Sequence, residues 1–98
     1  MANWRVMVQR EQAARDREGK KLGQLLSRHA EYTELQLKTR SILTQYEEQL
    51  ESVQDQSCSL TETQLYRVSI AQMRTALQKI DGQIYQLAMQ ISQARAKL

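Results

Sequence analysis

Proline is absent from this sequence of 98 residues, and glycine, cysteine and aromatic residues are rare. The chain has three glycines, one cysteine and no phenylalanine, and aromatic residues make up 5% of it. The lack of helix breakers favours long helices, and the lack of bulky aromatic side chains disfavours a thick globular core. We therefore expect a single domain, residues 1–98, in which long helices enclose a thin apolar core.

Other absences disfavour several classes of function. A lone cysteine, Cys58, cannot form an internal disulfide, the N-terminal residues do not form a signal peptide, and no apolar run reaches the roughly 20 residues of a membrane span. The sequence also has one histidine, His29, and lacks glycine-rich phosphate loops and metal-binding motifs. We expect a cytoplasmic protein that is not an enzyme, with no cofactor, no metal and no direct membrane insertion.

Charge is distributed unevenly along the chain. The net charge is +4 over residues 1–28, −4 over residues 29–59 and +3 over residues 60–98. The basic run "RDREGKK" could contact nucleic acid, but it contains acids and has no aromatic neighbours on which bases could stack. We therefore interpret it as a solvated helix face and expect no nucleic acid among the partners.

Apolar residues in the second half of the chain recur with a period of 3.5 residues. Alternate steps of four and three residues reach Tyr66, Ile70, Met73, Leu77, Ile80, Ile84, Leu87, Ile91, Ala94 and Leu98. A period that persists over this length is typical of a coiled-coil helix, and its apolar positions form the seam that faces the partner helix. We expect this helix to span about residues 60–98.

The first half has the same period, but its seam is more polar. The seam positions are Leu22, Leu25, His29, Tyr32, Gln36, Thr39, Leu43, Tyr46, Leu50 and Val53. Further upstream, the same steps reach charged residues at positions 11–18. The pattern predicts a helix over about residues 4–54, with residues 1–18 as an overhanging basic and acidic helix start.

A polar turn, residues 54–59, separates the two helical patterns, and Ser59 and Glu62 have the spacing of a capping box. A connection this short makes neighbouring helices antiparallel. We therefore predict an all-α fold, an antiparallel two-helix coiled-coil hairpin. A centre near residue 57 pairs Leu43 with Ile70, Tyr46 with Tyr66, His29 with Ile84, Leu22 with Ile91 and Glu18 with Arg95.

Further apolar residues lie beside the two seams. They are Leu26, Leu35, Ile42, Leu65, Val68 and Ala76. They widen each apolar stripe beyond the width that one partner helix covers. We expect them to form a second surface, one that binds a third element.

Three stretches, "KKLGQLLSRHAEY", "LKTRSILTQYEEQL" and "LYRVSIAQMRTALQKIDGQIYQL", follow one another in this order. Together they resemble the FliJ family of flagellar type III export proteins. The resemblance covers nearly the whole chain and includes Leu22-Gly23, Leu43 followed by Tyr46, the polar turn, and Met73 followed by Ala76-Leu77. The YscO stalk proteins of injectisomes are similar.

The resemblance implies a non-enzymatic stalk and escort protein of bacterial flagellum biogenesis, peripherally associated with the inner-membrane export apparatus. The implied partners are the export ATPase hexamer, the export gate membrane protein and the export chaperones. The positions that match the gate-binding residues of the family are Leu43, Tyr46, Leu50, Met73, Ala76 and Ile80. Thr39, Ser69 and Ile80 depart from the residue types that are usual in the family.

Several of the matched positions also lie on the predicted seam, so a role in the core competes with a role in partner contact. Two other functions fit the same residues. One is a stalk protein of an injectisome. The other is a generic coiled-coil scaffold that self-associates through its outer apolar residues.

Overall fold

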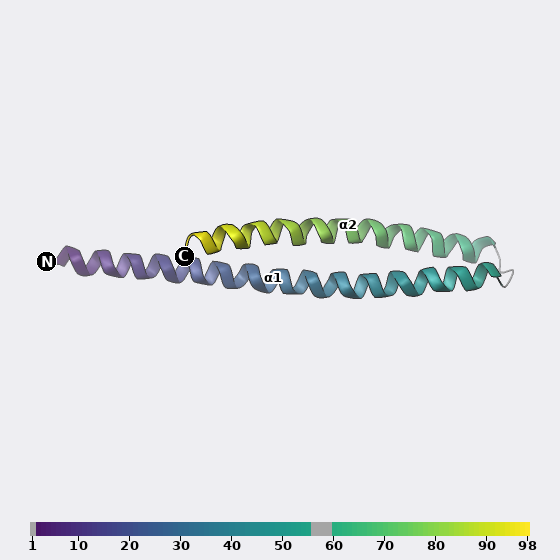
Figure 1. The fold of residues 1–98 in the computed structure, drawn as a ribbon, viewed down its shortest axis with the longest axis horizontal. Coiled ribbons are helices and arrows are strands. Elements are labelled where there is room, and N and C mark those ends of the chain that lie inside the picture. Colours follow the sequence, from purple (N-terminus) through teal and green to yellow (C-terminus); the bar gives the residue numbers. More distant parts are fainter. Residues whose placement is uncertain (1, 56–59) are drawn as a thin grey trace. The chain divides into compact units, whose positions relative to one another are not determined.

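The computed structural model describes residues 2–55 and 60–98, and these residues form two long α-helices (Figure 1). Helix α1 spans Ala2–Asp55 and helix α2 spans Leu60–Ala96. No β-strand occurs in the part of the chain that the structure describes. The predicted all-α hairpin is thereby confirmed, and the predicted ends of both helices agree with the observed ends to within two residues.

The predicted turn is only partly covered by the described residues. Gln54 and Asp55, which were assigned to it, belong to the last turn of α1. Ser59, the predicted capping residue, and Cys58 lie outside the described residues. The prediction of a capping box therefore stays a prediction.

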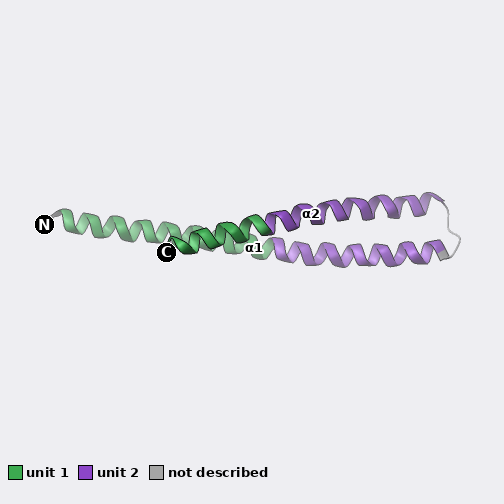
Figure 2. Ribbon diagram, turned by 45° about the horizontal axis from the view of Figure 1, so that its top comes forward, with its two compact units in different colours: residues 1–31, 85–98 green, residues 32–84 purple. Residues whose placement is uncertain are grey.

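The contacts within the chain define two compact units, and each unit contains a part of both helices (Figure 2). Unit 1 consists of Met1–Glu31 and Tyr85–Leu98, and unit 2 consists of Tyr32–Ile84. Within each unit, α1 and α2 run side by side in opposite directions. Each unit therefore has its own stretch of the seam.

The α2 side of the seam is the more deeply buried one. The buried side chains are Ile70, Ile80, Leu87, Ile91 and Ala94, and all five were predicted as seam positions. Four further predicted positions, Tyr66, Met73, Leu77 and Ile84, are half-buried. Leu98 is exposed because it lies beyond the end of α2 at Ala96. Nine of the ten predicted positions on this helix are thus confirmed.

The α1 side of the seam is shallower. All ten predicted positions, from Leu22 to Val53, are half-buried, and none is fully buried. Three of them, His29, Gln36 and Thr39, are polar and gain little from leaving water. The position of the α1 seam is therefore confirmed, and the burial is concentrated on the side chains of α2.

The predicted pairing of the helices agrees with the observed contact between Tyr46 and Tyr66. The rings of Tyr46 and Tyr66 meet edge to face, with centroids 5.8 Å apart and an interplanar angle of 83°. This is a favourable arrangement of two aromatic rings. The predicted pair of Glu18 and Arg95 is wrong, because Glu18 Oε2 is buried without a hydrogen-bond partner and no ion pair joins the two residues among the described side chains.

Candidate partner-binding surface

The six residues matched to the gate-binding positions all lie in unit 2, but they differ in burial. Ile80 is buried, with 8% of its surface exposed, so packing accounts for its apolar character. Leu43, Tyr46, Leu50 and Met73 are half-buried in the seam, and Ala76 is exposed. The structure thus gives five of these residues some accessible surface, and their role in binding stays a prediction.

Two grooves lie between the described parts of the two helices in unit 2, on opposite sides of the seam. The larger groove has a volume of about 580 Å³ and is lined by Tyr46, Gln49, Glu62, Leu65, Tyr66 and Ser69. The smaller groove measures about 290 Å³ and is lined by Glu47, Leu50, Glu51, Gln54, Arg67, Ile70, Ala71 and Arg74. Gln49 and Glu51 point in nearly opposite directions because two residues advance a helix by about 200°.

The larger groove belongs to a flank on which apolar side chains lie beside the polar Gln49, Glu62 and Ser69. On α1, Leu35, Ile42 and Gln49 are seven residues apart and lie on one line of the helix. On α2, Ser69 and Ala76 have the same spacing. We call this surface the apolar flank and define it by Leu35, Ile42, Tyr46, Leu65 and Ala76. Its side chains other than Tyr46 are exposed, including 64% of Leu65.

The smaller groove belongs to a flank that carries the polar links between the helices. Arg40, Glu47 and Gln54 on α1, and Arg67, Arg74 and Asp81 on α2, are each seven residues apart, and we call these six residues the charged flank. Two ion pairs cross between the helices here. Nη2 of Arg74 lies 3.4 Å from Oε1 of Glu47, and Nη2 of Arg40 lies 3.9 Å from Oδ1 of Asp81. Asp81 also accepts a hydrogen bond from the side-chain amide of Gln36. The two flanks of unit 2 therefore differ in chemistry.

A third groove follows the first turns of α2 in unit 2. Its volume is about 480 Å³, and its lining is Leu60, Thr61, Gln64, Leu65 and Val68, none of which is charged. Leu65 lines both this groove and the groove of the apolar flank. Leu60, at 83% exposed, was not singled out from the sequence, because it lies off the seam at the start of the helix.

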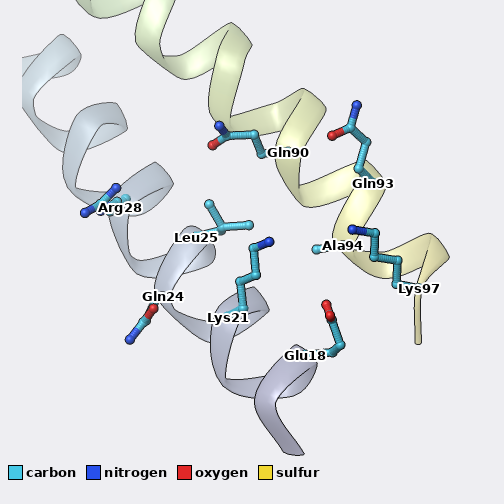
Figure 3. Close-up of a pocket in the computed structure, with 9 residues that line it drawn as sticks. All are labelled: Glu18, Lys21, Gln24, Leu25, Arg28, Gln90, Gln93, Ala94 and Lys97. Carbon is cyan, nitrogen blue, oxygen red and sulfur yellow. The ribbon is translucent and has the colours of Figure 1, made fainter. Parts of the chain in front are cut away.

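Unit 1 has a groove of a different character, with a volume of about 380 Å³ (Figure 3). Its lining includes Lys21 and Arg28 from α1, Lys97 from the segment that follows α2, and three glutamines. Glu18 contributes a buried carboxylate oxygen that has no hydrogen-bond partner. Leu25 and Ala94 are the apolar members of this lining, and its other side chains are charged or polar.

Among the described residues, no group of three or more His, Cys, Asp or Glu side chains could hold a metal ion. Nor does the described part contain a helix of the length and apolar character that crossing a bilayer requires. The two helices present exposed large apolar side chains in both units, among them Leu35, Ile42 and Leu65 in unit 2 and Trp4 and Met7 in unit 1.

Comparisons with known proteins add no relative of this chain. No protein-family model matches the sequence, no curated protein matches it, and no solved structure matches it.

Proposed function

We propose that this protein is a non-enzymatic stalk and escort protein of the flagellar type III protein export apparatus. In this role it binds the export ATPase ring and the export gate, and it assists the delivery of substrate chaperones. The proposal draws on the order and spacing of the motifs that resemble the FliJ family. The antiparallel hairpin of two long helices is the fold that the resemblance implies.

One observation supports the proposal most strongly. Tyr46, Met73 and Ala76, three of the residues matched to the gate-binding positions, keep exposed or half-buried surface in unit 2. Tyr46 lines the groove of the apolar flank, and Ala76 belongs to the same flank. Exposed apolar side chains on one flank are typical of a surface that binds another protein.

A binding experiment with purified proteins tests this function. The immobilised chain is titrated with the soluble part of the flagellar export gate and with the export ATPase, and the corresponding injectisome proteins serve as a second arm. We expect saturable binding of the flagellar proteins. Preference for the injectisome proteins would assign the chain to the other secretion system, and a lack of binding in both arms would contradict an export role.

Tyr46→Ala and Leu50→Ala sharpen the test, because the two residues line grooves on opposite flanks. We expect Tyr46→Ala to weaken gate binding about tenfold, as the loss of an interfacial aromatic anchor does. We expect a smaller effect of Leu50→Ala. Circular dichroism of both variants checks that the helices remain folded, because both side chains are half-buried.

Self-association as a coiled-coil scaffold is the second candidate function. The observation that favours it is the number of exposed apolar side chains beside the seam, among them Leu35, Ile42 and Leu65. Two copies could cover these side chains by forming a four-helix bundle. Sedimentation of the purified chain over a range of concentrations distinguishes the two candidate functions. A scaffold would be dimeric or larger, whereas a stalk protein would be monomeric.

A further inference from the structure

We propose that the groove of unit 1 binds an acidic segment of a partner protein, whose Asp or Glu side chains pair with Lys21, Arg28 and Lys97. We call it the basic groove and define it by these three cations together with Glu18, Gln90 and Gln93, which line the same space. The inference goes beyond the proposed function, because no residue of this groove is among the positions matched to the export gate. It does not depend on the export role.

The cations of the basic groove come from both of its walls. Lys21 and Arg28 lie seven residues apart on one line of α1, about 10 Å from each other along the helix axis. Lys97 belongs to the opposite wall, just after the end of α2. Figure 3 shows the side chains of Lys21 and Lys97 reaching from the two walls into the same space. A segment that enters the groove therefore meets cations on both sides.

These cations have no ion-pair partner among the described side chains. The ion pairs found there join residues of unit 2, and Glu18, the acid of the lining, does not pair with Lys21 or Lys97. Three cations against one carboxylate give the groove a net charge of +2, within a unit that has nine Lys and Arg residues against four acids. Charge complementarity therefore favours an acidic partner.

The lining suits a peptide better than a nucleic acid. Gln90 and Gln93 offer amide donors and carbonyl acceptors, which match the N–H and C=O groups of a peptide backbone. A DNA duplex instead presents one phosphate charge per roughly 1.7 Å, a far denser array than cations spaced about 10 Å apart beside the Glu18 carboxylate. None of the described residues that line the groove is an aromatic one on which a base would stack.

A second copy of this chain is a poorer occupant than a separate acidic protein. Most acids of the chain lie in unit 2, but Glu34, Glu47 and Asp81 already form ion pairs there. Unit 2 also has five Lys and Arg residues, which would repel the cations of the basic groove. A segment rich in Asp and Glu and poor in Lys and Arg avoids this repulsion.

The experiment titrates the full chain with two short synthetic peptides. Glutamate alternates with alanine in one peptide, and glutamine alternates with alanine in the other. We expect the glutamate peptide to bind at least about tenfold more tightly and to shift the NMR signals of Lys21, Gln90 and Gln93 most. Because the contacts are made by exposed charges, raising the salt from about 0.05 M to about 0.5 M should weaken this binding at least about fivefold.

Charge-matched variants separate the groove from the overall charge of unit 1. Lys21→Gln/Lys97→Gln removes two cations of the groove, and Lys20→Gln/Arg10→Gln removes two cations that do not line it. All four side chains are exposed, so we expect both variants to fold, which circular dichroism checks. The first should weaken binding of the glutamate peptide about tenfold, and the second should leave it within about twofold.

Glu18→Gln should have the opposite effect. It removes the carboxylate that repels an incoming acid and keeps an oxygen that can accept a hydrogen bond. We expect this variant to bind the glutamate peptide about threefold more tightly than the natural chain does. Weaker binding would overturn the proposal, because Glu18 would then attract the ligand.

Three other results would overturn the proposal. Equal weakening by the two double variants would show unspecific attraction to a basic unit. Tighter binding of a single-stranded oligonucleotide of the same charge would favour a nucleic-acid interface. A dimer of the free chain that dissociates in Lys21→Gln/Lys97→Gln would favour a second copy. Gate binding is measured separately, so a failure of the export function and a failure of this proposal are distinguishable.

Discussion

Unit 1 and unit 2 are built from the same two helices but arrange their charges differently. Unit 1 has nine Lys and Arg residues against four acids, and none of the nine forms an ion pair among the described side chains. Unit 2 has five against seven, and three ion pairs, Lys38–Glu34, Arg40–Asp81 and Arg74–Glu47, lie within it. The two ion pairs that link the helices of unit 2, Arg40–Asp81 and Arg74–Glu47, both lie on the charged flank.

The difference shows that the seam and the surface of this hairpin are specified separately. Both units bury apolar side chains of α2 at heptad spacing, namely Ile70 and Ile80 in unit 2 and Leu87 and Ile91 in unit 1. The seam holds the helices together in each unit, because burial of apolar surface dominates folding. Solvent-exposed ion pairs contribute little to stability. The charges on the surface of each unit therefore matter more for what the unit can bind than for how firmly it is folded.

The largest expected effect comes from shortening a buried seam residue in either unit. Ile70 and Leu87 are each 5% exposed. We expect Ile70→Ala and Leu87→Ala each to lower the free energy of unfolding by about 2–4 kcal/mol. Val68→Ala on the exposed side of α2 should lower it by less than about 1 kcal/mol. Urea unfolding followed by circular dichroism measures all three, and similar losses for Val68 and Ile70 would contradict the assigned seam.

The smallest expected effect concerns the charges, in which the units differ. A double-mutant cycle on Glu47 and Arg74 should give a coupling free energy of about 0.5 kcal/mol or less, and molar salt should remove it.

Lys21→Gln, in unit 1, should leave the stability unchanged or raise it slightly, because Lys21 has no described ion-pair partner and unit 1 is strongly basic. A clear loss of stability on neutralising Lys21 would show that the charges of unit 1 are paired after all.

The sequence predicted the seam almost residue by residue, since a period of 3.5 leaves one stripe of each helix to be buried. It missed the exposure of Leu98, because helix ends are less sharply specified than periods. It also paired Glu18 wrongly with Arg95, because the rotamers of long charged side chains do not follow from register. The Tyr46–Tyr66 contact followed from the position of the turn, since a short connection fixes which residues face each other.

The two flanks of unit 2 were not distinguished from the sequence, although their heptad lines are readable in it. Leu35, Ile42, Leu65 and Ala76 were grouped only as residues beside the seam. The apolar line of Leu35, Ile42 and Gln49 and the polar line of Arg40, Glu47 and Gln54 lie on opposite sides of the same helix. Their significance became apparent only when the cross-helix ion pairs and the grooves showed which line of α1 faces which line of α2.

The pairing of α1 with α2 inside a single molecule is the claim on which the flanks depend, and an NMR measurement on Tyr46 and Tyr66 tests it most directly. A mixture of isotope-labelled and unlabelled chains separates contacts within one molecule from contacts between two. With ring centroids 5.8 Å apart, we predict clear nuclear Overhauser effects between the two rings within one molecule. Effects seen only between labelled and unlabelled chains, or none between these rings, would contradict the hairpin and both of its flanks.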